Sequence, residues 1–363
     1  MIRLVKPSIG QEEKKLINEV LDSGMLASGK YVQDFERKFA SLCGAKHGIA
    51  VSSGTTALHA ALLACGCCQG DLVITTPFSF IATANSVLYC GARPLFADIN
   101  EDDFNISPER IEYLLKKNKK AKFVMIVHLF GNPCRMDDIM YLKKKYGFSL
   151  IEDCAQSHEA EYGGKKTGTF GDASAFSFYA TKNMLTGEGG IVLTGSDRVD
   201  ALARKIINHG RKDRYSHDIL GYNYRMTNIA AAIGLAQITK ISKMTDKRIA
   251  IAEKYSRALG DDHKYVLPSK HKKAKHVYHQ YTLQCSDNAG LQEYLGAQGV
   301  ETGIIYPLSI PAQPLYRKLG YRTDDVPVSR KMEGRVISIP VNPLLKDTEI
   351  KKVIAALESW EED

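Results

Sequence analysis

The sequence predicts an α/β protein with a mostly parallel, mixed sheet, helices on both of its faces, and a smaller C-terminal α/β domain. Two observations carry this prediction. Strand-like and helix-like segments alternate through the first half of the chain, as in parallel strands joined by crossover helices. From about residue 261 the pattern changes to a few short strands between helices. With 363 residues, 44% of them hydrophobic, the chain can bury a sizeable core.

The first elements are two helices and a strand. Amphipathic patterns run from Glu12 to Leu21 and, after a glycine-marked turn, between residues 32 and 42, so both segments are predicted to be helices that cover the sheet. The strand His47–Val51 then runs into the turn Ser52–Thr56 and the helix Ala57–Ala64. A strand, a Ser/Gly/Thr turn and a helix start gather unpaired N–H groups and the positive dipole end, which favours phosphate. The other interpretation is plain capping of the helix.

The middle of the chain supplies the rest of the main sheet. The predicted strands and helices are, in order, Leu72–Thr75, Ile81–Tyr89, Arg93–Ala97, Pro108–Lys117, Phe123–Val127, Met136–Tyr146 and Ser149–Asp153. In such sheets ligands bind beyond the carboxyl ends of the strands. Asp153, the turn Ser52–Thr56 and the segment Phe78–Phe80 each follow a strand, so we expect them to converge on one crevice.

The stretch Asp172–Gly190 contains a single lysine, Lys182. It follows the predicted strand Ala173–Phe178 and precedes three glycines, which places it on a short turn between rigid neighbours. A lysine in a partly desolvated pocket, or beside another cation, can lose its proton and then condense with an aldehyde. The other interpretation is a lysine in a surface loop, as most of the 49 Lys and Arg residues are.

The second half of the chain is predicted to hold a bridge and the smaller domain. The expected elements are a strand Gly189–Thr194, helices Arg198–Ile207, Asn228–Ile238 and Lys243–Leu259, strands near Tyr278–Gln284, Thr302–Ile305 and Val336–Ile339, and helices Gly290–Gln298 and Thr348–Trp360. The helix from Lys243 is interpreted as the bridge between domains. We therefore predict a large domain over residues 1–242 and a small one over 243–363.

Charge and cysteine usage exclude several classes of function. The formal net charge is +8, but the basic residues fall into separate groups without interleaved aromatics, so we expect solvated faces and no nucleic-acid site. The chain has no apolar run long enough to span a bilayer and no signal-peptide pattern at its start, so neither a membrane nor secretion is expected. Its eight scattered cysteines fit reduced thiols in the cytoplasm, and the cluster Cys65, Cys67 and Cys68 lacks the partners of a metal site.

Together these stretches resemble the DegT/DnrJ/EryC1/StrS family of sugar aminotransferases, which have the fold type I of enzymes that use pyridoxal 5'-phosphate (PLP). The resemblance covers nearly the whole chain, and the matching motifs stand in the family's order: Ser52–Leu58, Phe80–Asn85, Ile151–His158, Gly171–Phe178 with Lys182, Gly187–Gly190 and Gly221–Met226. No single motif is as specific as their combination.

The resemblance implies a role for each of these positions. Lys182 would hold PLP covalently and act as the general base, and Asp153 would pair with the protonated pyridine nitrogen and keep the ring able to accept electrons. Gln156 would bond to the ring hydroxyl and Phe80 would stack on the ring. The phosphate would be held by Gly54, Thr55, Thr56 and Ser177, with Asn223 reaching it from the second subunit of a homodimer.

The resemblance also implies the reaction. L-glutamate would donate its amino group and leave as 2-oxoglutarate, and a keto-sugar on a nucleoside diphosphate would accept the amine for an amino sugar of a surface glycan or a similar product. A sugar dehydratase of the same family is one alternative, although it typically has histidine in place of Lys182. A non-catalytic PLP-binding regulator is the other, although such regulators usually add a basic DNA-binding domain.

The chain departs from the family pattern at two positions. Glu159 follows His158 where the family usually has glycine, and Pro311 stands in the loop Tyr306–Gln313 where many members place a histidine. We expect the second change to affect sugar recognition. Because we assign that loop to the small domain, away from the turns that hold PLP, we expect it to leave the cofactor chemistry untouched. The sequence does not decide between amination at C3 and at C4, or which nucleotide is carried.

Overall fold

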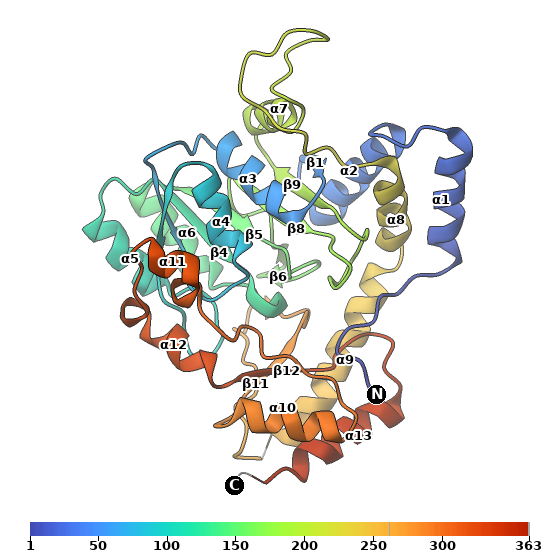
Figure 1. The fold of residues 1–363 in the computed structure, drawn as a ribbon, viewed down its shortest axis with the longest axis vertical. Coiled ribbons are helices and arrows are strands. Elements are labelled where there is room, and N and C mark those ends of the chain that lie inside the picture. The colour runs from blue at the N-terminus through green and yellow to red at the C-terminus, as the bar shows by residue number, and fades with distance from the viewer. Residues whose placement is uncertain (261, 362–363) are drawn as a thin grey trace.

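The computed structural model describes residues 1–260 and 262–361, and a seven-stranded mixed sheet lies at its centre (Figure 1). The strand order is β1-β9-β8-β5-β4-β2-β3. Only β9 runs antiparallel to its neighbours β1 and β8, whereas β8, β5, β4, β2 and β3 pair in parallel. The bounds are β1 His47–Val51, β2 Leu72–Thr75, β3 Arg93–Phe96, β4 Phe123–Val127, β5 Ser149–Asp153, β8 Ala173–Ser177 and β9 Gly190–Thr194. The predicted mostly parallel sheet is confirmed.

Helices cover both faces of this sheet. Successive side chains along a strand point to opposite faces, and apolar side chains on both faces pack against helices. Met125 and Ala175 face a core shared with α3, α4 and α7, whereas Ile126 packs on α5 and α6, and Phe176 on α2 and α8. The bounds are α1 Gln11–Ser23, α2 Lys30–Cys43, α3 Gly54–Ala64, α4 Ala82–Tyr89, α5 Pro108–Lys117, α6 Met136–Tyr146, α7 Asp197–Ile206 and α8 Asn228–Ile238. The predicted bounds agree with these to within a few residues.

The C-terminal part is built on a small antiparallel sheet of β11 Tyr281–Gln284 and β12 Val336–Ile339. Three helices pack on it around one apolar cluster: α9 Ile241–Leu259, α10 Asn288–Ala297 and α13 Asp347–Glu358. The predicted strand at Thr302–Ile305 is wrong, because this segment forms only one bridge, between Gly303 and Ser338. The remaining short elements are β6 Glu161–Tyr162, β7 Lys165–Lys166, β10 Ala274–Lys275, α11 Pro314–Lys318 and α12 Pro327–Glu333, with short 3-10 turns η1 Leu129–Gly131, η2 Ile310–Ala312 and η3 Thr323–Asp325.

The two parts of the chain exchange segments. The N-terminal residue Ile2 pairs with Val300 and belongs to the apolar cluster of the small sheet. In the other direction, Ile310 and Tyr316 pack against Ala84 of α4. The domain boundary between residues 242 and 243 stays a prediction. Helix α9 begins just before this boundary, close to the end of α8, and leads to the small sheet (Figure 1).

Among the described residues, no helix is both long and apolar enough to cross a membrane. The cysteines form thiols rather than disulfides at Cys43, Cys65, Cys67, Cys68, Cys90, Cys134 and Cys154. Most of them are buried, so burial raises the pKa of thiols such as Cys43 and Cys65, to about 12 in both cases. These thiols therefore stay protonated and inert, which agrees with the interpretation of the cysteines as reduced.

Candidate active site

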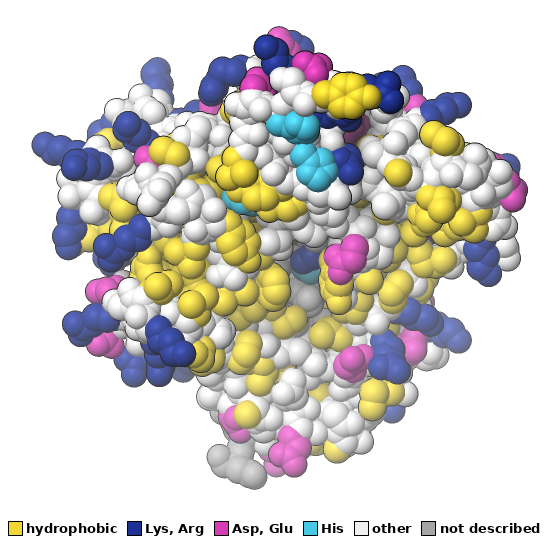
Figure 2. All heavy atoms as spheres, turned by 45° about the horizontal axis from the view of Figure 1, so that its top comes forward, with side chains coloured by type: hydrophobic (Ala, Val, Ile, Leu, Met, Phe, Trp, Pro, Cys, Tyr) yellow, Lys and Arg dark blue, Asp and Glu magenta, His cyan; other side chains and the backbone are white. Residues whose placement is uncertain are grey.

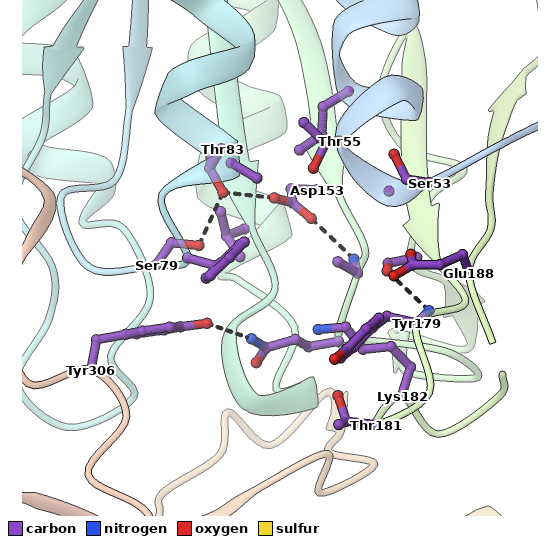
Figure 3. A pocket seen from close by; sticks show the side chains of 18 residues that line it. Ser53, Thr55, Ser79, Thr83, Asp153, Tyr179, Thr181, Lys182, Glu188 and Tyr306 are labelled. Atoms are coloured by element: carbon purple, nitrogen blue, oxygen red, sulfur yellow. Dashed lines mark hydrogen bonds between the residues drawn. The ribbon is translucent and has the colours of Figure 1, made fainter. Parts of the chain in front are cut away.

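A cavity of about 510 Å³ opens at the carboxyl ends of the parallel strands. It is lined by the segments that the sequence predicted to converge, together with several others: Ser53, Gly54, Thr55, Leu58, Ser79, Phe80, Ala82, Thr83, Val127, Asp153, Ala155, Gln156, Ser177, Tyr179, Thr181, Lys182, Glu188 and Tyr306. Figure 3 shows the labelled side chains meeting around one space. Apart from Thr56 and Asn223, every predicted site residue lies on this wall.

One end of the cavity is a turn that we call the cradle, Ser53, Gly54 and Thr55 at the start of α3. The Ser53 hydroxyl accepts the N–H of Thr56 at 3.1 Å, and the Thr56 hydroxyl accepts the N–H of Ser53 at 3.0 Å. The N–H groups of Gly54 and Thr55 lie in the first helical turn, where an α-helix offers no acceptor. They are left for an anion, which the helix dipole also favours.

Glycine is required at position 54 because the cradle lies against β8. A Cβ there would stand 2.6 Å from Cβ of Ser177, closer than real contacts allow. The close approach brings the Ser177 hydroxyl next to the cradle. The Thr56 side chain serves the capping box instead, which is the alternative that the sequence had left open for this turn.

Asp153 lies at the end of β5 and is 3% exposed. Its Oδ2 accepts the Thr83 hydroxyl at 2.8 Å, and its Oδ1 accepts the N–H of Ala155 at 3.0 Å. Thr83 is held in turn by Ser79 at 3.0 Å. Burial raises the pKa of Asp153, and these two hydrogen bonds and the charge of Lys182 oppose the rise. The carboxylate is therefore oriented but lacks a direct cationic partner among the described residues.

Lys182 enters the cavity from the turn after β8, on the side of Tyr179 and Thr181 (Figure 3). Its Nζ makes no hydrogen bond or ion pair with any residue that the structure describes. Desolvation lowers the pKa of Lys182 to about 8, and the negative charge of Asp153 limits that fall. An unpaired amine that is partly neutral near pH 8 can act as a nucleophile and as a base.

Gln156 and Phe80 lie on the wall between these groups. The Gln156 carbonyl oxygen accepts the N–H of Phe130 at 2.8 Å, and its amide nitrogen donates to the Tyr306 hydroxyl at 3.0 Å. Phe80 is 60% exposed, an unusual state for phenylalanine that suits a ring offered to a ligand. Asn223 is exposed, pairs with Asn208 and is not among the residues that line this cavity. The loop between these two residues projects beyond α7 (Figure 1).

One expectation about the small domain is wrong. The loop that carries Pro311 does not lie away from the predicted cofactor turns, because Tyr306 lines the cavity and bonds to Gln156. The N–H of Ile310 also donates to the carbonyl of Pro77 at 2.8 Å, just before Phe78. Pro311 itself is buried in the turn η2 and does not line the cavity.

The departure from the family pattern at Glu159 is explained by its contacts. Glu159 has a left-handed backbone with φ of 64°, which favours glycine. Its carboxylate accepts hydrogen bonds from Lys166 at 3.1 Å and from Ser242 at 3.0 Å. These bonds hold the buried side chain and offset the backbone strain, so glutamate can occupy this position.

The sequence pattern of the DegT/DnrJ/EryC1/StrS aminotransferase family matches residues 7–358. The chain belongs to this family. It is 37% identical to GDP-perosamine synthase from Vibrio cholerae, over 99% of each chain, and 37% identical to a pleiotropic regulatory protein from Geobacillus stearothermophilus, over 96% of this chain and 93% of that one. The solved structure of DesV from S. venezuelae superposes with a TM-score of 0.94 at 31% identity, over 96% of this chain and 94% of that one.

Family membership confirms the predicted fold, PLP as the cofactor and nucleotide-sugar aminotransferase as the class of enzyme. The cavity fits PLP on its own chemistry. Judged on the part of the chain that the structure describes, it offers an unpaired lysine, a buried carboxylate without a direct cationic partner, an exposed aromatic ring and, at the other end, free N–H groups for a phosphate. Sequence reasoning missed Thr83 and Tyr306, although Thr83 stands one helical turn after Ser79 and could have been found as its neighbour.

Proposed function

We propose that this chain transfers the amino group of L-glutamate to the keto group of a sugar carried on a nucleoside diphosphate, with Lys182 and Asp153 as its catalytic residues. The observation that carries the proposal is the meeting, in one cavity, of an unpaired lysine with a pKa of about 8 and a buried carboxylate. GDP is the first candidate nucleotide, since a relative similar along its full length is named GDP-perosamine synthase.

Each residue of the wall has a part in holding the cofactor. The cradle N–H groups and the hydroxyls of Thr55 and Ser177 would bind the phosphate of PLP. Asp153, fixed by Thr83 and Ala155, would pair with the ring nitrogen, since a buried carboxylate gains most from a cation placed against it. Phe80 would lie on the ring and Gln156 at its edge. Thr56 would support the phosphate site by fixing this turn, because its N–H and its hydroxyl both bond to Ser53.

Lys182 would have two tasks. As the covalent anchor of PLP it uses its neutral amine, which the lowered pKa makes available near neutral pH. Once the donor has taken its place, Nζ would accept the proton from Cα of glutamate and return it later. PLP, when bound, supplies the electron-accepting ring that makes this proton acidic enough to remove. The same proton movements in reverse would accompany transfer of the amino group to the keto-sugar.

A homodimer with shared sites is part of the proposal. Asn223 is exposed near the base of a projecting loop whose Tyr215 and Leu220 are each 81% exposed. Hydrophobic side chains also cover much of the face seen in Figure 2. Large apolar side chains in contact with water are typical of a surface that a partner covers. We expect the partner to cover these side chains, so that the Asn223 side chain of each copy completes the phosphate site of the other.

Complementation tests the shared sites. Neither Lys182→Ala nor Asn223→Ala alone should support full turnover, but a mixed dimer contains one site with both native residues. Mixing the two variants should therefore restore activity that neither has alone. A monomeric mass in solution, together with no gain on mixing, would contradict the shared site.

A regulator without catalytic activity is the second candidate, because one relative is named a pleiotropic regulatory protein. The reaction with glutamate alone separates the two candidates. The aminotransferase should release one 2-oxoglutarate per bound PLP without any sugar, and should then aminate at least one member of a panel of GDP-, dTDP- and UDP-linked keto-sugars, detected by mass spectrometry. Binding of PLP with no release of 2-oxoglutarate would favour the regulator. The reducing cytoplasm is the proposed location, in keeping with the buried thiols.

A further inference from the structure

Tyr306 lies on the cavity wall and bonds to Gln156, a residue that we assign to the cofactor ring. Its hydroxyl accepts the amide hydrogen of Gln156 at 3.0 Å. The phenol ring packs edge-on against Phe78, with 6.1 Å between ring centroids. Burial raises the pKa of Tyr306, so the hydroxyl stays protonated and keeps one proton to donate. This oxygen atom thus contacts the residue that we place at the ring edge (Figure 3).

Gln156 is fixed by two opposite contacts. The N–H of Phe130 holds its carbonyl oxygen at 2.8 Å, and Tyr306 holds its amide nitrogen. Both bonds are needed to set the plane of the amide, because with one of them the amide can still turn about the remaining contact. The orientation of the Gln156 amide plane decides which of its atoms faces the cavity. It therefore decides which contact Gln156 can make with a ring bound there.

Tyr306 comes from a segment of the C-terminal part of the chain that is itself anchored on the large sheet. Gly303 bridges to Ser338 of the small sheet, and the N–H of Ile310 then donates to Pro77 at 2.8 Å. The Tyr316 hydroxyl donates to Asn85 of α4 at 2.9 Å. The segment 303–316 therefore joins the small sheet to the cofactor wall, with Tyr306 as its contact at the cavity.

We propose that Tyr306 is a positioning residue that sets the orientation of Gln156 against the cofactor ring, and so links the small-domain segment 303–316 to the cofactor. The inference rests on the proposed function, because it assumes that PLP occupies this cavity. It assigns no proton transfer to Tyr306. The hydroxyl acts through Gln156 rather than on the reacting atoms.

Tyr306→Phe tests this inference, because it removes the hydroxyl and keeps the ring that packs on Phe78. We expect PLP to dissociate about threefold to tenfold more readily, as for the loss of one hydrogen bond. The visible absorption band of the PLP-loaded protein should shift, and the pH at which that band changes should move with it. Tyr316→Phe is the matched control, since it removes one hydroxyl bond from the same segment outside the cavity. It should leave band and affinity unchanged.

A double-mutant cycle tests the route through Gln156. In a Gln156→Ala background, Tyr306→Phe should weaken PLP binding by clearly less than in the native background, because the hydrogen-bond partner of the hydroxyl is already gone. Equal losses in both backgrounds, or an unshifted band in Tyr306→Phe, would overturn the inference. The same spectral change in Tyr316→Phe would overturn it too, since general loosening of the segment would then explain the effect. If the unaltered protein takes up no PLP, the proposed function itself fails, and this inference with it.

Discussion

At the cradle end of the cavity Ser53 and Thr56 bond to each other and neutral N–H groups are left for an anion, whereas at the Lys182 end a charged amine has no hydrogen-bond or ion-pair partner among the described residues. Ser53 and Thr56 close a capping box, and Gly54 fits against Ser177 without room for a side chain. Lys182, by contrast, is influenced by the charge of Asp153 without a direct bond to it, and Arg248, which lines a small pocket together with Lys182, has an Nε atom with no hydrogen-bond partner among the described residues. The cradle is built to hold a ligand in place, and the lysine end is built to react.

This comparison predicts that changes at the two ends have different signatures. Changes at the cradle should weaken the binding of PLP and leave the chemistry of bound PLP nearly intact. Changes at the lysine end should do the reverse. The predictions below run from the largest expected effect to the smallest.

Lys182→Ala should abolish turnover. The variant loses both the covalent anchor and the base, and general base catalysis alone is worth about 10²–10⁴-fold in rate. We expect release of 2-oxoglutarate from glutamate to fall at least about 10³-fold, measured in single turnover with PLP added in excess. Lys182→Arg is the matched control: it keeps the positive charge but cannot serve as nucleophile, and should be equally inactive. Activity within tenfold of the native rate in either variant would remove Lys182 from the site.

Asp153→Asn should slow proton removal and spare binding. The cradle and Lys182 remain, so PLP should still be taken up. Loss of a buried charge-assisted pair commonly costs several kcal/mol, and each 1.4 kcal/mol is about tenfold in rate, so the single-turnover reaction with glutamate should slow roughly a hundredfold or more. An Asn variant that releases 2-oxoglutarate at the native rate would show that Asp153 is not the partner of the ring.

Gly54→Ala should show the opposite signature. The added methyl group meets Ser177 at 2.6 Å, and such overpacking typically costs about 1–3 kcal/mol, so PLP should bind roughly tenfold to a hundredfold more weakly. The rate of the fully loaded variant should stay within a few fold of native. Gly195→Ala is the control, since a Cβ at that exposed position meets nothing within 4 Å. Normal PLP affinity in Gly54→Ala would contradict the cradle.

The pH dependence of PLP uptake is the mildest test. A neutral amine is needed for the covalent bond, and an ordinary lysine with a pKa near 10.4 would be less than about 1% neutral at pH 8. Lys182, with its pKa lowered to about 8, should be about half neutral there. The uptake rate, followed by stopped-flow absorbance, should therefore rise with pH and level off above about 8. A rate that keeps rising tenfold per pH unit up to pH 10 would show that Lys182 is not desolvated.

Much of the fold followed from periodicity and turn residues. The strands His47–Val51, Phe123–Val127 and Ser149–Asp153 are buried and bounded by turns, so the sequence predicts their bounds, and with them the place of Asp153. Lys182 was found because a lone lysine stands between a strand and glycines. The segment Thr302–Ile305 was mistaken for a strand because its apolar residues pack as an irregular connection instead.

The part of the site that could not be predicted from the sequence consists of contacts between residues far apart in the chain. Tyr306 reaches Gln156 over 150 positions in the chain, and nothing in the local pattern of either residue signals the contact. At Thr56 a local contact led to the difference. A threonine hydroxyl can bind a phosphate, but the hydroxyl of Thr56 bonds to the neighbouring Ser53 instead. Residue type and local spacing indicate which chemistry is available, whereas packing decides which side chains remain free to use it.

The most direct test of the account is covalent trapping of the cofactor. The native protein loaded with PLP and treated with sodium borohydride should lose its visible colour, and peptide mass spectrometry should find the reduced pyridoxyl group on Lys182, with other lysines unmodified. The Asp153→Asn protein should be labelled at the same residue. A protein that takes up no PLP, or that carries the label on a lysine outside this cavity, would contradict the assignment of Lys182 and, with it, the placement of the chemistry at this end of the cavity.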